Sequence, residues 1–335
     1  MLPLKDASFQ ADLHRESTAM VAVIAKPIGK PIGKPGTSRR KRTGNPAHRR
    51  DWQVALLLIL PATAGFITFA AYPTIRGIYL SFTDFKILTP PSWTGLANYR
   101  HLLSDSVFWH SIGVTVYFVA LSVGIGLAVS LLSAVILHRL TDSTVIRGMV
   151  LLPFLISGVV AALIWQWMLD PGLGIINSLV KSLAGHNIMF LGSSEWAIPS
   201  LALISVWKSM GYNAILIFAG LQTIPGEIYE AGRIDGAGEI RMFTKLTLPL
   251  LRPILAMVMV LTVIGSFQVF DLVAVTTKGG PANASNVLPL YIYKTGFGEF
   301  NFGYAVTMSM ALFVMLLTIT FIQMRLMRAN ESDTN

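Results

Sequence analysis

Long apolar stretches alternate with short polar connections along most of the chain. Six stretches are apolar over about 20 residues or more, the length that a helix needs to cross the hydrocarbon core of a bilayer. They are residues 53–80, 111–137, 149–168, 199–221, 253–276 and 304–324. Tryptophans lie near several of their ends, as is typical at the depth of lipid headgroups. The pattern therefore predicts an all-α polytopic membrane protein with six transmembrane helices.

Composition supports this reading and excludes a large soluble core. The chain has 335 residues, of which 53% are hydrophobic and 13% are charged. Soluble domains have about 25% charged residues, so this chain has about half of what a water-facing surface needs. The sequence contains no cysteine, which excludes a disulfide framework, a thiolate metal site and a cysteine nucleophile.

The basic character of the chain is concentrated at its N-terminus. Residues 1–51 hold 11 Lys and Arg against four acidic residues, so they carry +7 of the net charge of +9. A Lys-Pro-Ile-Gly repeat at residues 26–36 opposes both helix and sheet. We therefore expect residues 1–50 to be a disordered basic tail. Such a tail either binds anionic lipid headgroups or is a solvated extension that enforces topology.

The distribution of Lys and Arg among the connections predicts the orientation of the chain. With the N-terminus inside, the inner segments hold 19 of these residues and the outer segments hold five. This predicts that both termini are cytoplasmic, with a transmembrane domain over residues 51–325 and a short cytoplasmic tail at 326–335. The connection at residues 222–252 is then a cytoplasmic loop.

Motifs that would indicate an enzyme are absent from the sequence. It contains no His-Glu-x-x-His metal pair, no Gly-x-Ser-x-Gly elbow and no dinucleotide fingerprint that opens a helix after a strand. The stretch Gly29–Lys34 is one residue too short for a phosphate-binding loop and lies in the basic tail. We therefore expect a protein that is not an enzyme and has no catalytic residues, metal or cofactor of its own.

The cytoplasmic loop at residues 222–252 has an unusually structured pattern. Residues 227–231 are predicted to form a helical turn with acidic residues near its start, where the helix dipole favours them. Gly236 and Gly238 interrupt the helix, and residues 239–247 read as a second, amphipathic helix. Such a helix pair suits insertion into a groove of another protein. An ordinary interfacial loop is the alternative that these residues leave open.

Two motifs in and beyond this loop resemble a known family. Residues 230–237 (EAGRIDGA) and 246–253 (LTLPLLRP) resemble the EAA loop of permease subunits of binding-protein-dependent ABC importers, in the maltose, trehalose and glycerol-phosphate branch. Gly232 stands where the family usually has alanine, and Leu246 where it often has isoleucine. Residues 270–281, which end in TTKGGP, resemble the subunit type that pairs with a different homologous permease. The resemblance covers about residues 50–325.

The resemblance implies a type I permease fold in a bacterial inner membrane and a mechanical role. In this family the EAA loop forms a coupling helix that docks into a cleft of a cytoplasmic ATPase. The implied partners are a homologous second permease, an ABC ATPase dimer that binds the ATP, and an extracellular or periplasmic sugar-binding protein. Carried over by position, the expected coupling residues are Glu230, Ala231, Gly232, Asp235 and Gly236.

Polar side chains within the spans are candidates for a substrate path, because they are costly in a membrane unless they are paired or face a cavity. The candidates combine hydrogen-bonding groups for sugar hydroxyls with aromatic faces for the ring: Lys208, Tyr212, Asn213, Phe267, Gln268, Phe270 and Asp271. Alternatively, Lys208 and Asp271 form an internal ion pair and the aromatic residues only pack. The expected substrate is a di- or oligosaccharide, and the alternatives are a glycerol 3-phosphate importer or a stand-alone secondary transporter.

Overall fold

The computed structural model describes residues 47–87, 89–140 and 143–329. The chain divides into two units, Met1–Thr63 and Ala64–Asn335. The predicted basic tail, residues 1–50, lies outside the described residues except for its last four positions. These positions begin helix α2 (Ala47–Phe66), which contains Pro61.

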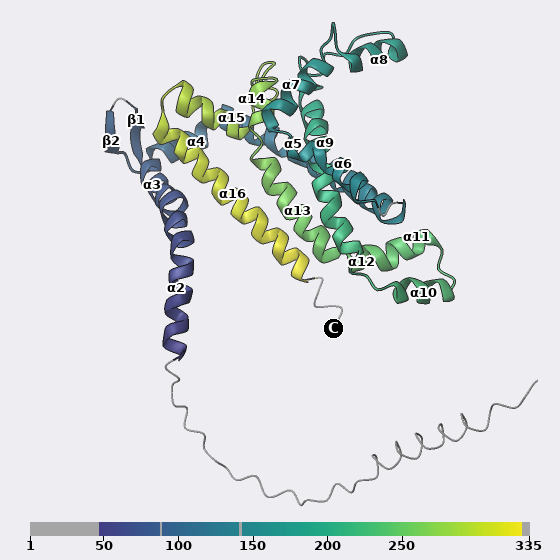
Figure 1. Ribbon diagram of the computed structural model, residues 1–335. Coiled ribbons are helices and arrows are strands. Elements are labelled where there is room, and N and C mark those ends of the chain that lie inside the picture. The colour runs from purple at the N-terminus through teal and green to yellow at the C-terminus, as the bar shows by residue number, and fades with distance from the viewer. Residues whose placement is uncertain (1–46, 88, 141–142, 330–335) are drawn as a thin grey trace, which may run out of the picture. The chain divides into compact units, whose positions relative to one another are not determined.

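The second unit is built from helices that are joined by short connections and a small hairpin (Figure 1). After the end of α2, its helices as far as α9 are η1 (Ile67–Ala71), α3 (Tyr72–Ser81), α4 (Ala97–Ser104), α5 (Ser106–Leu140), α6 (Thr144–Leu155), α7 (Gly158–Met168), α8 (Ile175–Ala184) and α9 (Ala197–Leu221). The remaining ones are α10 (Gly226–Ile234), α11 (Glu239–Met242), η2 (Phe243–Thr247), α12 (Leu248–Leu250), α13 (Arg252–Phe267), α14 (Asp271–Val275), α15 (Leu288–Tyr293), η3 (Lys294–Gly298) and α16 (Phe302–Ala329). The three η elements are π-helical turns.

Five helical stretches in the described ranges are long and apolar enough to cross a membrane. They are Val54–Ser81, Ser106–Leu140, Ala197–Leu221, Arg252–Val275 and Phe302–Met327. The pair α6 and α7 makes a sixth if it is one span, with a bend of 91° between its halves. The prediction of an all-α polytopic protein is confirmed.

Helix α9 lies at the centre of the second unit. It packs along α5 over much of its length and also contacts α6 and α13. Gly211 brings α9 and α6 together, because a Cβ at this position would overlap the carbonyl oxygen of Val150. The largest core cluster joins α5, α9 and α13 through side chains such as Phe118, Leu201 and Val263. The tight approach fixes the positions of the side chains on this part of α9 relative to α6.

The strands in the described ranges form one antiparallel hairpin between α3 and α4. Strand β1 (Thr83–Lys86) pairs with β2 (Thr89–Trp93), with Thr83 opposite Trp93. The carboxamide of Asn98 on α4 donates to the carbonyl oxygens of Ser81 and Thr83. These bonds tie the hairpin to α4.

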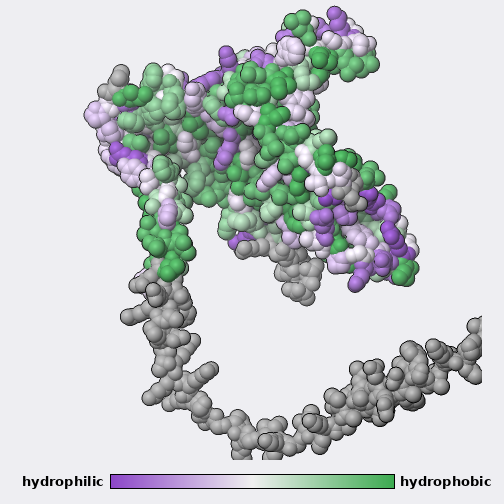
Figure 2. Space-filling view, viewed as in Figure 1, coloured by the Kyte–Doolittle hydropathy of each residue, from purple (hydrophilic) through white to green (hydrophobic). Residues whose placement is uncertain are grey.

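Hydrophobic side chains cover much of the visible outer surface of the helices (Figure 2). Hydrophilic residues gather instead over α10 and α11. An apolar outer surface of this extent is what lipid or other membrane subunits can cover, whereas a polar helix pair suits water.

Candidate functional sites

Helices α10 and α11 form a pair that extends beyond the ends of α9 and α13 (Figure 1). The turn between them depends on Gly236, whose φ of 75° lies in the left-handed region. The N–H groups of Gly236 and Ala237 donate to the carbonyl oxygens of Arg233 and Gly232. These two bonds form a Schellman motif, which ends α10 and reverses the chain toward α11.

The two arms of the loop pack through Gly232. This residue is buried, and a Cβ here would lie 3.0 Å from Cδ1 of Leu246 on η2. The hydroxyl groups of Tyr229 and Thr247 share a hydrogen bond of 3.1 Å between the same arms. Gly232 therefore allows the two arms of the loop to pack closely against each other.

The other predicted coupling residues, Glu230, Ala231, Asp235 and Gly236, are exposed. Two further residues were not singled out from the sequence: Ile234 is 85% exposed at the end of α10, and Ile240 is 81% exposed on α11. The two isoleucines flank the glycine turn. Each of these isoleucines stands between two charged residues in the sequence, and this was the signal that could have revealed them.

An ion pair connects the helix pair to the end of α5. Nη2 of Arg139 lies 2.8 Å from Oε2 of Glu239, and both side chains are about half exposed. A cavity of about 430 Å³ lies between the end of α5 and the loop, with Val135, His138 and Tyr229 in its wall. The last turn of α5 is thus one of the places where loop and bundle meet.

A second candidate site lies where two broken helices meet inside the bundle. The chain between α6 and α7 breaks at residues 156–157, and the chain between α13 and α14 breaks at residues 268–270. Oδ2 of Asp271 lies 3.1 Å from the position that a Cβ at Gly158 would occupy. Asp271 is the first residue of α14, and Gly158 is the first residue of α7. The carboxylate therefore lies beside the first residue of α7, at a helix N-terminus whose dipole favours negative charge.

Lys208 lies on α9 beside a pair of aromatic rings. Its Nζ is 5.7 Å from the centre of the Phe154 ring, and this ring stacks on Tyr212 with 4.4 Å between centroids. In the described part of the chain, no carboxylate lies within 4.0 Å of the Lys208 ammonium. The alternative of a direct ion pair with Asp271 is therefore not what the structure contains. Phe154 was not predicted as a neighbour of Lys208, because the two residues are 54 positions apart in the sequence.

The remaining predicted path residues differ in accessibility. Asn213 is 3% exposed and donates from its amide to Oγ1 of Thr262, and Phe267 is 4% exposed within the largest core cluster. Gln268 is exposed, and Phe270 is half-buried with its ring 5.0 Å from that of Tyr293. The structure thus brings Lys208, Tyr212, Gln268, Phe270 and Asp271 to accessible positions, whereas Asn213 and Phe267 hold neighbouring helices together.

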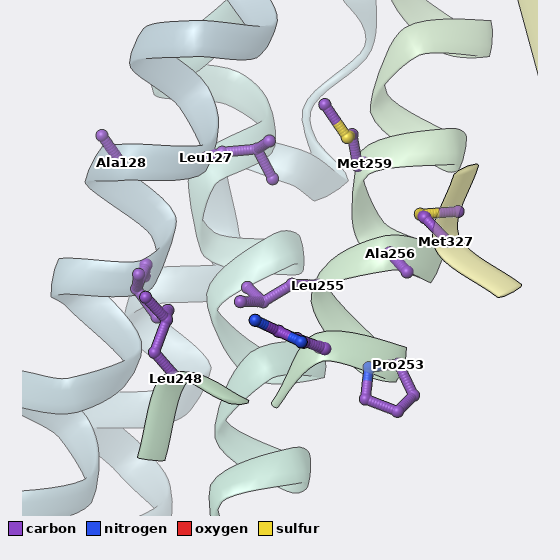
Figure 3. Close-up of a pocket in the computed structure, with 10 residues that line it drawn as sticks. Leu127, Ala128, Leu248, Pro253, Leu255, Ala256, Met259 and Met327 are labelled. Atoms are coloured by element: carbon purple, nitrogen blue, oxygen red, sulfur yellow. The ribbon is translucent and has the colours of Figure 1, made fainter. Parts of the chain in front are cut away.

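A separate cavity of about 470 Å³ lies between α5, α12, α13 and α16 (Figure 3). Apart from Arg252, its wall is aliphatic or methionine, including Leu127, Leu255, Met259 and Met327. This lining lacks the donors and acceptors that a sugar needs. Among the described residues, no group of three or more His, Asp or Glu side chains could hold a metal ion.

The end of the bundle that carries α4 and α15 contains a hydrogen-bond network around Asp105, which we call the far-end network. Oδ2 of Asp105 accepts hydrogen bonds from the hydroxyls of Tyr291 (2.8 Å) and Tyr304 (2.6 Å). Oδ1 accepts from the N–H groups of Val107 (2.8 Å) and Phe108 (3.2 Å), which caps α5.

These hydrogen bonds determine the charge state of Asp105. Burial pushes the pKa of the Asp105 carboxyl upward, but the four hydrogen bonds together outweigh burial and hold this pKa below its ordinary value. Burial and the bond to Asp105 raise the pKa of Tyr291, so this hydroxyl remains a donor. Two more hydrogen bonds join α5 to the start of α15 and the residues before it: Asn286 donates to Oγ of Ser111, and Oγ1 of Thr115 accepts from the N–H of Leu288.

Comparisons with known proteins agree on one family. The family described as "Binding-protein-dependent transport system inner membrane component" matches residues 126–334. The sulfoquinovosyl glycerol transport system permease protein SmoG of Agrobacterium fabrum is 31% identical over 84% of this chain and 92% of its own length. The trehalose/maltose transport system permease protein MalF of Thermococcus litoralis is 32% identical over 83% of this chain and 95% of its own length.

A solved structure shares the fold. It is a bacterial ABC transporter involved in the import of the acidic polysaccharide alginate, with a TM-score of 0.75 and 24% identity. The match covers 84% of this chain and 97% of the solved chain. The predicted type I permease fold is confirmed.

Proposed function

The chain belongs to the family of binding-protein-dependent transport system inner membrane components, and from this premise we infer that it is a permease subunit of a sugar importer. It is a transport subunit in the membrane and not an enzyme, since ATP hydrolysis in such importers is the work of a separate ATPase. Its further partner is a substrate-binding protein, which lies on the side of the membrane opposite the ATPase. The substrate that we infer from these relatives is a di- or oligosaccharide.

We propose that α10 and α11 dock into the ATPase. The observation that carries this proposal is the exposure of Ile234 and Ile240 on both sides of the Gly236 turn. Burying an exposed isoleucine yields about 1.5–3 kcal/mol, so two of them on one helix pair favour a protein partner. Glu230 and Asp235 in the same loop are also exposed and supply charge for basic or donor groups of that partner.

We further propose the orientation and the second permease. The Lys and Arg distribution puts both termini and the helix pair in the cytoplasm. A homologous second permease completes the path, and each permease carries its own helix pair onto one ATPase subunit. When ATP closes the ATPase dimer, the helix pairs move with it and the permeases rock from inward- to outward-facing.

The proposed substrate path runs past the two helix breaks, with Lys208, Tyr212, Gln268, Phe270 and Asp271 along it. Gln268 and Asp271 offer partners for hydroxyl groups, and Tyr212 offers an aromatic face for a sugar ring. A glycerol 3-phosphate importer would use the same fold and path. A stand-alone secondary transporter would give the exposed isoleucines no partner, which makes it the weaker alternative.

Co-purification with the ATPase tests the proposal. The full chain is expressed together with its ATPase and second permease, and the amount of ATPase that accompanies the tagged permease from the membrane is measured. We expect Ile234→Ser combined with Ile240→Ser to lower this amount at least about tenfold, since about 1.4 kcal/mol of lost binding corresponds to a factor of ten. Leu183→Ser is the control, because Leu183 on α8 is 80% exposed but lies outside the loop.

Two outcomes would contradict the proposal. One is that the ATPase remains bound to the double variant as tightly as to the unchanged chain. The other is sugar transport by the purified permease alone in liposomes without ATP.

A further inference from the structure

The proposed substrate path contains a positive charge without a negative partner in the described part of the chain. Lys208 is near the middle of α9, roughly 17 Å from the start of the helix at about 1.5 Å per residue. Holding a lysine at the centre of a membrane costs about 2.5–3.5 kcal/mol. The contact with the Phe154 ring offsets only about 0.5–2 kcal/mol of this. The ammonium is therefore a positive charge on the path that is open to pairing with an anionic group.

The acid on the same path does not pair with this ammonium. Asp271 lies against Gly158, the first residue of α7, so its carboxylate is at the positive end of that helix. It is not within 4.0 Å of Lys208, and no other described carboxylate is. The acid of the path thus lies beside a helix N-terminus, whereas the ammonium has an aromatic ring but no described carboxylate within 4.0 Å.

The surroundings of Lys208 fit a sugar that bears a charged group. The stacked rings of Phe154 and Tyr212 form an aromatic surface beside the ammonium, on which the C–H face of a sugar ring can lie. The close approach of Gly211 to Val150 holds α6 against α9 and so fixes these rings relative to Lys208. One charge next to an aromatic surface is an arrangement that binds an anionic group and a ring together.

We propose that the substrate is an anionic sugar, one that carries a phosphate, sulfonate or carboxylate group, and that Lys208 binds this group. The inference rests on the proposed function, because it names the substrate class of the same path. A hydrogen bond between two ions is about twice as strong as one between neutral groups. An ammonium placed here would gain little from a neutral sugar and much from an anionic one.

The first test needs no knowledge of the sugar. The assembled transporter is reconstituted in nanodiscs and titrated with iodide, an anionic quencher of tryptophan fluorescence, and with neutral acrylamide. Trp207 precedes Lys208, and its signal is isolated by subtracting that of the Trp207→Phe variant. We expect Lys208→Gln to lower iodide quenching of Trp207 about twofold, because the positive charge concentrates anions, and to leave acrylamide quenching unchanged. Lys181→Gln on α8 is the control and should change neither.

The second test measures ATP-dependent uptake of glycerol 3-phosphate and glucose 1-phosphate against maltose and trehalose. For an anionic probe that is transported, we expect Lys208→Gln to raise KM at least about tenfold and Lys208→Arg to restore it. The KM for any neutral probe should change less than about twofold. If none of the four probes is transported, the iodide result decides.

Two results would overturn the inference. Iodide quenching that does not depend on Lys208 would mean that an acid of the neighbouring subunit neutralises the ammonium. ATP-dependent uptake of neutral sugars alone would remove the anionic substrate but leave the proposed function intact. Failure of the proposed function has a different signature, namely a permease that does not bind an ATPase at all.

Discussion

The polar contacts at the two ends of helix α5 differ in strength. At its first turn, Asp105 accepts four hydrogen bonds in the far-end network. At its last turn, Arg139 makes an ion pair with Glu239 in which both side chains are about half exposed. Charged hydrogen bonds contribute about 1.5–3 kcal/mol each, whereas an exposed ion pair contributes about 0–1 kcal/mol.

This difference indicates which end of the bundle moves. An element that must follow a partner during a transport cycle needs weak, exchangeable contacts with its own chain. The helix pair α10–α11 has such contacts, whereas α4, α15 and the start of α16 are joined through Asp105 and its neighbours. We infer that the far-end network keeps one end of α5 fixed while the helix pair pushes on the other.

The largest expected effect comes from Gly236, because the turn of the helix pair depends on its φ of 75°. A residue with a side chain costs about 1–2 kcal/mol in this region, and a β-branched one costs more. We expect Gly236→Val to abolish uptake while the amount of chain in the membrane stays unchanged. Uptake of radiolabelled substrate and quantitative immunoblotting of membranes measure the two quantities.

Gly238→Val is the matched control for this prediction. Gly238 has an ordinary φ of −71°, and no atom lies within 4 Å of a Cβ at this position. The substitution removes a favoured N-cap residue from α11, which costs less than about 1 kcal/mol, so most uptake should remain. Equal loss of uptake in both variants would show that the turn conformation is not the cause.

A smaller effect, on stability instead of coupling, is expected at the far-end network. Asp105→Ala leaves the hydroxyls of Tyr291 and Tyr304 without their acceptor and removes the cap of α5. We expect a loss of about 2–4 kcal/mol, measured as a fall in the melting temperature of the detergent-purified transporter. Asp84→Ala, which breaks an exposed pair with Lys86, should change the melting temperature little.

The pH dependence of this effect follows from the lowered pKa of Asp105. A carboxyl whose pKa is lower in the folded than in the unfolded chain stabilises the fold fully above the unfolded pKa of about 3.9. That stabilisation is lost only as the pH falls from there through the folded pKa. The difference in melting temperature between Asp105→Ala and the unchanged chain should therefore be constant from about pH 6 to pH 8. A difference that shrinks over this range would contradict the assigned charge state.

The fold class could be predicted because crossing a bilayer imposes a local requirement, about 20 apolar residues in a row. The break between α6 and α7 could not, since the apolar composition continues through residues 150–165 while the helix bends by 91°. The far-end network was also beyond prediction. Its bonds join Asp105 to tyrosines 186 and 199 positions away, and no local pattern reports such contacts.

For the candidate sites, the sequence motif indicated the loop but not which of its side chains face outward. The side of α10 that meets η2 is set by tertiary packing, which buries Gly232 and exposes Ile234. Along the substrate path, periodicity grouped Lys208 with Tyr212 on one face of α9. The Phe154 ring that completes this group comes from another helix, and only the fold brings it there.

The smallest expected effect is at the ion pair between Arg139 and Glu239, and it is the sharpest test of how the helix pair acts on α5. Because both side chains are about half exposed, solvent screening limits the pair to about 0.2–1 kcal/mol. We expect Arg139→Gln and Glu239→Gln each to slow ATP-dependent uptake about twofold without changing the melting temperature. The double charge swap Arg139→Glu with Glu239→Arg should recover the lost rate. Recovery would show that the pair transmits the movement, whereas additive losses in a double-mutant cycle would show that the two residues act separately.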